Sequence, residues 1–135
     1  MSETFDHIAI AVKDLETALK FYREAFGLAH SRIETYESIK TVIAYIPAGP
    51  VEIHLLSPSE PGAGSIGAFV ESTGGGFHHM AFKTDDIEKT VGHLGTMHVG
   101  IRGNTIVDVR PGLRAAMTAQ PDLTQNVSIE LLERK

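Results

Sequence analysis

Three histidines and one glutamate occupy strand-like segments of this 135-residue sequence. His7 lies in "DHIAIAV", His54 in "VEIHLL", His79 in "HHMAF" and Glu130 in "VSIELL". A buried imidazole needs a hydrogen-bond partner or a metal, so histidines inside apolar runs are candidates for chemistry. Imidazoles with a carboxylate suit Co²⁺, Ni²⁺, Zn²⁺, Mn²⁺ or Fe²⁺, whereas Ca²⁺ prefers oxygen ligands. These residue types predict a site for a divalent transition metal.

The four residues belong to an internal repeat. Two segments, "DHIAIAVKDLETALKFY" and "HHMAFKTDDIEKTVGHL", align at an offset of 72 residues. The matched pairs are His7 with His79, Ala9 with Ala81, Asp14 with Asp86, Leu15 with Ile87, Glu16 with Glu88 and Leu19 with Val91. The later segments "VEIHLL" and "VSIELL" place His54 over Glu130 at an offset of 76. A single strand histidine is more often a core residue than a ligand, but equivalent positions in two copies favour a metal site.

The repeated unit is predicted to be a strand, a helix and three further strands. The first strand covers residues 5–12, and a helix follows with Asp14 as its N-terminal cap and Gly27 as its stop. Asp86 is the corresponding cap in the second copy. Further strands are predicted at residues 40–46, 51–58, 114–121 and 126–133, a short helix with a glycine exit at 66–76, and strand and loop at 95–112. The chain is predicted to be one α+β domain over residues 1–135, with module 1 at about 1–60, a linker and short helix at 61–76, and module 2 at about 77–135.

Strand alternation sorts the side chains onto two faces. The face that bears His7, His54, His79 and Glu130 is small and polar, which is expected to leave room for a ligand. The opposite face is more apolar and suits packing under the helices. His78 points toward that helix side and is interpreted as a structural neighbour. The other histidines, His30, His93 and His98, are expected on the surface.

Composition excludes several classes of protein. The net charge of −5 and the absence of Lys/Arg runs argue against nucleic-acid binding. No apolar stretch approaches the ~20 residues of a membrane span, and no signal peptide is evident. There is no cysteine for a disulfide or a thiolate ligand. A soluble, cytoplasmic protein is expected.

Together, "DHIAIAVKDLETALKFYREAFGL", "GGGFHHMAFKTDDIE" and "QPDLTQNVSIELLE" resemble the vicinal oxygen chelate superfamily, and within it the methylmalonyl-CoA epimerases. The resemblance implies two pseudo-symmetric βαβββ modules that form an incomplete barrel around a divalent metal, in a homodimer. It implies metal ligands at His7, His54, His79 and Glu130. The expected reaction is epimerisation of a 2-methylmalonyl-CoA-type thioester through an enolate. Lys40, Arg102, Arg110 and Arg114 are available to an acyl-CoA substrate.

Two departures from the epimerase pattern bear on the chemistry. His54 stands where these epimerases usually have an amide or a carboxylate. Thr41 stands where some of them have a glutamate base. The candidate proton carriers are therefore Glu52, which shares a strand face with His54, and Glu130. Other functions remain open: a glyoxalase-like isomerase or lyase, an Fe²⁺ dioxygenase, or a non-catalytic small-molecule binding or resistance protein.

Overall fold

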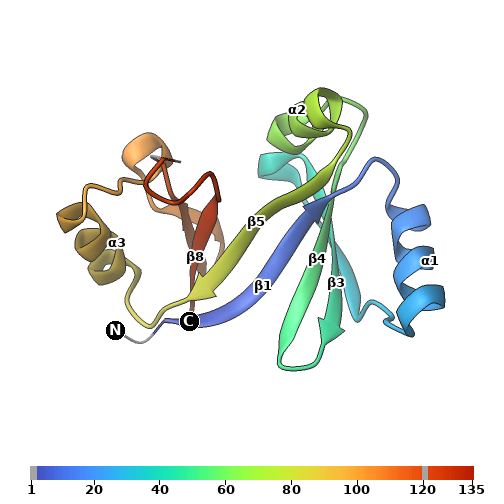
Figure 1. Cartoon of the computed structure of the whole chain (residues 1–135), viewed down its shortest axis with the longest axis horizontal. Coiled ribbons are helices and arrows are strands. Elements are labelled where there is room, and N and C mark those ends of the chain that lie inside the picture. Colours follow the sequence, from blue (N-terminus) through green and yellow to red (C-terminus); the bar gives the residue numbers. More distant parts are fainter. Residues whose placement is uncertain (1–2, 120–121) are drawn as a thin grey trace. The chain divides into compact units, whose positions relative to one another are not determined.

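The computed structural model describes residues 3–119 and 122–135 and contains two compact units (Figure 1). The N-terminal unit is His7–His78, and the C-terminal unit is His79–Lys135 together with the residues as far as Asp6. Among the described residues, no helix is both long enough and apolar enough to cross a membrane.

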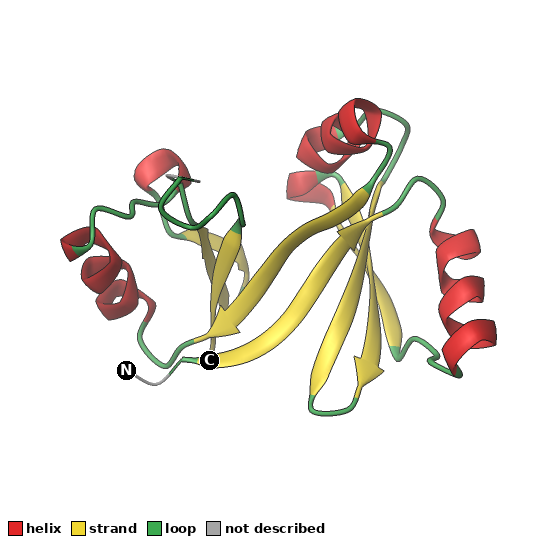
Figure 2. Ribbon diagram, viewed as in Figure 1, coloured by secondary structure: helices red, strands yellow, loops and turns green. Residues whose placement is uncertain are grey.

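The predicted βαβββ order occurs twice, so the α+β fold class is confirmed. The first module contains β1 (Thr4–Ala11), α1 (Leu15–Phe26), β2 (Arg32–Tyr36), β3 (Thr41–Ala48) and β4 (Val51–Pro58), with a 3₁₀ turn at Glu37–Ile39 and with α2 (Gly64–Thr73) after it. The second contains β5 (Gly76–Lys83), α3 (Ile87–Thr96), a 3₁₀ turn at Arg102–Asn104, β6 (Val107–Arg110), β7 (Leu113–Met117) and β8 (Ile129–Arg134). Figure 2 shows α1 and α3 beside the strands of their own modules.

Strand pairing is the same in both modules. In the first, β1 pairs in parallel with β4, β4 antiparallel with β3, and β3 antiparallel with β2. In the second, β5 pairs in parallel with β8, β8 antiparallel with β7, and β7 antiparallel with β6. Ala9 lies opposite His54, and Ala81 lies opposite Glu130. This register confirms the alignment of His54 with Glu130 that the sequence predicts.

Helices cover both faces of the N-terminal sheet. On the face away from His7, Leu19 of α1 packs with Ile46 and Leu55. On the face that bears His7, Ile66 and Val70 of α2 pack with Ala9, Ala11 and Leu56. The expected packing under α1 is confirmed. At the alanine end of this face α2 covers the sheet, while the room for a ligand expected near the histidines stays a prediction.

In the C-terminal unit, α3 covers the sheet face opposite Glu130. Ile87 of α3 packs with Ala116 and Leu131, and both it and Leu131 are buried. Ala81 packs with Ala115 and Leu132 in a separate cluster. These three side chains lie on the face that bears Glu130.

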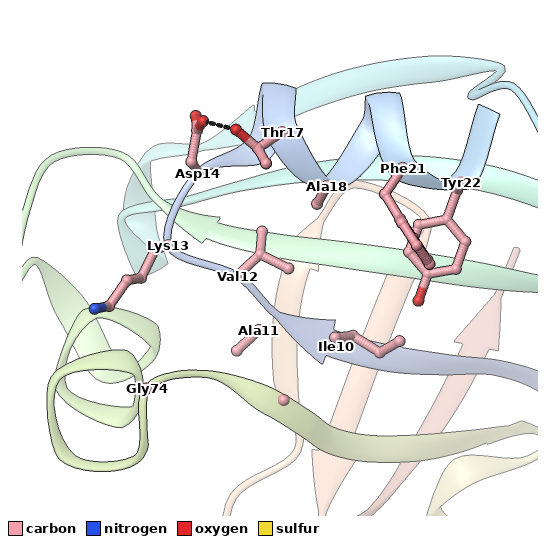
Figure 3. Close-up of a pocket in the computed structure, with 11 residues that line it drawn as sticks. Ile10, Ala11, Val12, Lys13, Asp14, Thr17, Ala18, Phe21, Tyr22 and Gly74 are labelled. Carbon is pink, nitrogen blue, oxygen red and sulfur yellow. Dashed lines mark hydrogen bonds between the residues drawn. The ribbon is translucent and has the colours of Figure 1, made fainter. Parts of the chain in front are cut away.

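The helix ends match the sequence prediction with one exception. Gly27 ends α1 in the left-handed region, with φ of 69°, and Asp86 caps α3 by accepting from the Lys89 amide at 3.1 Å. Asp14 occupies the N-cap position of α1, but its carboxylate accepts from the hydroxyl of Thr17 and from no backbone amide (Figure 3). The predicted backbone cap was wrong there, because the side chain three residues later is a hydroxyl donor that competes for the carboxylate.

Two strand predictions need correction, and one strand was missed. Strand β2 was not located by sequence, because its polar side chains face the protein and its apolar one does not. Ile33 is 45% exposed, and polar side chains alternate with it on the other face. Strand β8 begins at Ile129, later than predicted, since Gln125 and Asn126 adopt positive φ. The strand predicted at 114–121 is β7, which ends at Met117; residues 120–121 lie outside the described chain.

Candidate metal centre

In the N-terminal unit the structure brings His7 and His54 together. They come from the parallel neighbours β1 and β4, and both are buried, at 3% and 4% exposure. Their rings stack with centroids 3.6 Å apart and an angle of 19° between the planes. Two buried imidazoles in contact are a pair of nitrogen donors of the kind that transition metals bind.

The imidazole of His54 has two further contacts within its own sheet. Its Nε2 lies 2.9 Å from Oε1 of Glu52, which is two residues earlier on the same face of β4. The ring of Tyr45 meets it edge-on, with centroids 4.5 Å apart and planes at 70°. Tyr45 lies directly opposite His54 in the register of β3 and β4. Glu52 is thus in contact with a predicted ligand.

Tyr45 is part of a hydrogen-bonded cluster that extends to the strand β2. The hydroxyls of Tyr45 and Tyr36 are 2.5 Å apart, and the Tyr36 hydroxyl donates to Glu34 at 2.6 Å. Arg32 donates to the same carboxylate at 2.9 Å, and its guanidinium lies 3.7 Å from the centre of the Tyr45 ring. Sequence reasoning missed this cluster because β2 was not located, although the alternation of Arg32, Glu34 and Tyr36 in "RIETY" was a usable signal.

Burial and hydrogen bonds keep this cluster in one protonation state. Burial first, and then the bonds to Glu34 and Tyr45, raise the pKa of Tyr36 well above its usual range. Burial also raises the pKa of Tyr45. Burial alone would lower the pKa of Arg32, but its hydrogen bond to Glu34 raises it on balance. Both tyrosines are therefore neutral hydrogen-bonding groups at physiological pH.

In the C-terminal unit the structure brings His79 and Glu130 together. His79 on β5 is buried at 5% exposure, and its Nε2 lies 3.4 Å from Oε1 of Glu130 on β8. The side chain of Glu130 is 20% exposed. Met117 lies opposite Glu130, at the position that Tyr45 takes opposite His54. This unit therefore presents a nitrogen donor and an oxygen donor side by side.

Other residues that the sequence singled out lie apart from these pairs. Thr41 is buried, and its hydroxyl donates to the carbonyl of Ile39 at 2.9 Å. His78 packs edge-on against Phe69 of α2, which agrees with a structural role. The remaining histidines, His30, His93 and His98, are exposed as predicted.

Two of the expected substrate-binding cations are engaged within the C-terminal unit. Arg114 forms ion pairs with Glu88 and Glu133, both at 2.6 Å. Arg102 donates to the hydroxyl of Ser128 at 2.9 Å. In the acidic group formed by Asp86, Glu88 and Glu133, Arg114 pairs with the two glutamates, and Asp86 accepts from the Lys89 amide.

A groove of about 540 Å³ lies along α1 in the N-terminal unit (Figure 3). Its walls include Ile10 of β1, Val12 directly after β1, Phe21 and Tyr22 of α1, and Gly74. Ile10 and Val12 alternate with Ala9 and Ala11, so they point away from the face that bears His7. None of the predicted metal ligands lines the groove, which is therefore separate from the histidine pair.

The fold and the two donor pairs agree with the class of protein that the sequence matches. Residues 4–111 match the Glyoxalase/Bleomycin resistance protein/Dioxygenase superfamily, and the chain belongs to it. Each pair, two imidazoles in one unit and an imidazole with a carboxylate in the other, offers donor types that suit a borderline divalent cation.

Among individual proteins, the chain is 32% identical over 130 residues to the uncharacterised protein YqjC of Bacillus subtilis, covering 96% of this chain and 91% of that one. It is 30% identical over 82 residues to the ethylmalonyl-CoA/methylmalonyl-CoA epimerase of Cereibacter sphaeroides, covering 61% of each chain. Among solved structures, it superposes on a single-substitution variant of Streptomyces coelicolor methylmalonyl-CoA epimerase in complex with 2-nitronate-propionyl-CoA. That match has a TM-score of 0.83 and 25% identity, and it covers 95% of this chain and 92% of that one.

Proposed function

We propose that this chain is a metal-dependent epimerase of a 2-methylmalonyl-CoA-type thioester, acting through an enolate. The observation that carries the proposal is the matched register of the two modules, in which Ala9 faces His54 as Ala81 faces Glu130. Each module thereby offers a donor pair that contains at least one buried imidazole, as a duplicated chelating site requires. The similarity to two acyl-CoA epimerases gives the proposed substrate class.

The proposed ligands are His7, His54, His79 and Glu130. Their support is the internal repeat, the burial of the three histidines and the pairing of each ligand with another inside its own unit. An imidazole at His54 in place of a carboxylate raises the net charge of the ligand set by one. A divalent cation, when bound, supplies positive charge that stabilises the negative charge developing on an enolate.

Proton transfer is the task of the chain's own carboxylates. Epimerisation removes the weakly acidic proton between the thioester and the carboxylate of the substrate and returns a proton to the opposite face. Thr41 cannot serve as the base, because a hydroxyl is too weakly basic near neutral pH and this one donates to the carbonyl of Ile39. The candidate carriers are Glu130 and Glu52, which lie beside His79 and His54 respectively.

The proposed reaction is tested by proton exchange in D₂O. Purified protein is stripped with a chelator, divided, and reloaded with Co²⁺ or left without metal, and each sample is incubated with methylmalonyl-CoA. We expect mass spectrometry to find deuterium at the α-carbon at least 100-fold faster with the reloaded protein, because stabilisation of an enolate by a fixed charge contributes about 3 kcal/mol or more. Exchange at the uncatalysed rate by the Co²⁺-reloaded protein would refute the epimerase proposal.

A second function is favoured by the histidine at position 54. Two imidazoles and one carboxylate are the ligand set of many Fe²⁺ oxygenases, and three of the four proposed ligands are histidines. A glyoxalase-like isomerase or lyase uses the same scaffold. A protein that binds metal but does not exchange the α-proton of methylmalonyl-CoA would move the assignment to one of these reactions.

A further inference from the structure

We propose that Glu52 is a positioning residue that holds the imidazole of His54 as its Nε2–H tautomer. The lone pair available to a divalent cation is then on Nδ1. This inference rests on the proposed metal site, and it decides between the two roles that Glu52 can have in it. The proton-carrier role then belongs to Glu130.

The contact between the two residues sets the tautomer. Nε2 of His54 lies 2.9 Å from Oε1 of Glu52, which is a good hydrogen-bond distance. A carboxylate can only accept, so the hydrogen is on Nε2. A neutral imidazole carries one ring hydrogen, so Nδ1 holds the lone pair.

The surroundings of the ring oppose its reversal. The imidazole is buried at 4% exposure, with the ring of His7 stacked on it and the edge of Tyr45 against it. Tyr45 is itself fixed by the hydroxyl of Tyr36 and by the guanidinium of Arg32. A ring flip would put the carbon Cε1 where Nε2 now lies, and it would break the bond to Glu52 inside this packed group.

A difference between the modules supports the assignment. Glu52 aligns with Ser128, just as His54 aligns with Glu130. A carboxylate ligand has no tautomer to select, and the hydroxyl of Ser128 instead accepts from Arg102. The carboxylate neighbour thus occurs in the module whose ligand is an imidazole, where a second group that orients the ring strengthens metal binding.

The first test reads the tautomer without any metal. Protein labelled with ¹⁵N-histidine is stripped with a chelator, and long-range ¹H–¹⁵N spectra are recorded at pH 8, with His54→Gln to assign the signal. For His54 we expect the pattern of the Nε2–H tautomer in the wild type. In Glu52→Leu we expect that pattern to be lost or replaced by a mixture of the two tautomers. An Nδ1–H pattern in the wild type would overturn the inference whether or not the protein binds metal.

The second test separates positioning from proton transfer. Glu52→Gln keeps a hydrogen-bond acceptor for Nε2, whereas Glu52→Leu removes it. The control for the loss of one negative charge is Glu24→Leu, at an exposed position of α1. In Co²⁺ titrations we expect affinity about 10- to 100-fold weaker for Glu52→Leu and within about threefold of wild type for Glu52→Gln. α-Proton exchange in either variant should fall no further than its metal occupancy accounts for.

The outcomes distinguish the inference from the function on which it rests. Wild-type Co²⁺ affinity in Glu52→Leu would overturn the positioning role. Exchange abolished in Glu52→Gln with its metal fully bound would instead make Glu52 the catalytic base. Absence of Co²⁺ binding by the wild type would refute the proposed metal site, while the tautomer spectra would still decide how Glu52 acts on His54.

Discussion

Equivalent residues of the two modules differ in a coordinated way. Around His54 the neighbours are a carboxylate and a tyrosine, Glu52 and Tyr45; around Glu130 the aligned positions hold Ser128 and Met117. An imidazole needs its tautomer and ring plane fixed, whereas a carboxylate does not. His54 and Glu130 therefore each have neighbours suited to their own chemistry.

At the residue scale, the adjacent histidines of β5 are expected to respond differently to truncation. His79→Ala and Glu130→Ala should each abolish Co²⁺ binding in calorimetric titration, because each removes a proposed ligand. His78→Ala should bind Co²⁺ as the wild type does and lose about 1 kcal/mol of unfolding free energy with its edge-on contact to Phe69. Wild-type binding in His79→Ala or Glu130→Ala would refute the assigned ligands.

Sequence reasoning located the histidines because a period of two identifies residues that share a strand face, and an internal repeat aligns them. It did not find their neighbours. The contact between Glu52 and His54 was within reach of the alternation rule, but the position of Tyr45 opposite His54 depends on the register of β3 and β4. Register is a property of paired strands, and a single segment does not encode it.

At the element scale, a buried carboxylate joins α3 to the sheet below it. Glu133 of β8 is 2% exposed, accepts from the first backbone amide of α3, that of Ile87, at 2.9 Å, and pairs with Arg114 of β7. The Ile87 amide first, and then Arg114, hold the pKa of Glu133 below its usual range. Hydrogen bonds to Glu88 and then to Glu133 raise the pKa of Arg114. Sequence periodicity did not predict the bond to Ile87, because it links residues 46 positions apart.

The pH dependence of this bond has a definite sign. Because the folded-state pKa of Glu133 is lowered, its ionised form stabilises the fold above the unfolded-state pKa of about 4.3, and that contribution is lost as pH falls through the lower folded value. Glu133→Gln keeps an acceptor for Ile87 but lacks the charge. We expect this variant to be less stable than wild type in urea at pH 7, with a gap that narrows below about pH 4.

The control is Glu88→Gln, which removes the exposed carboxylate partner of the same Arg114. Its effect on the urea midpoint should be much smaller, because an exposed ion pair contributes little. A stability gap for Glu133→Gln that stays constant down to about pH 3 would argue against the charge of Glu133 as the stabilising feature.

The strand β2 illustrates where a period-two prediction fails. Its buried face carries Glu34 and Tyr36 in a hydrogen-bonded cluster, and its other face carries the exposed Ile33. Polar side chains inside and an apolar one outside reverse the usual pattern of a half-buried strand. The same cluster holds the ring of Tyr45 against His54. The polar residues that make β2 irregular therefore also support the candidate site.

At the scale of the whole molecule, the chain is a duplicated βαβββ module whose copies have kept their fold and diverged in their side chains. One copy supplies two imidazoles, and the other an imidazole and a carboxylate. Neither pair alone offers the three or four ligands that a transition metal usually takes from a protein. We therefore expect the two copies to act on one cation rather than on two.

The stoichiometry of metal binding tests this expectation most directly. Chelator-stripped protein is titrated calorimetrically with Co²⁺, in parallel with His7→Ala from one module and His79→Ala from the other. We expect one Co²⁺ per chain for the wild type, and binding that is lost or at least roughly 100-fold weaker in both variants. Two independent cations per chain, with one retained in each variant, or no cation at all, would contradict it.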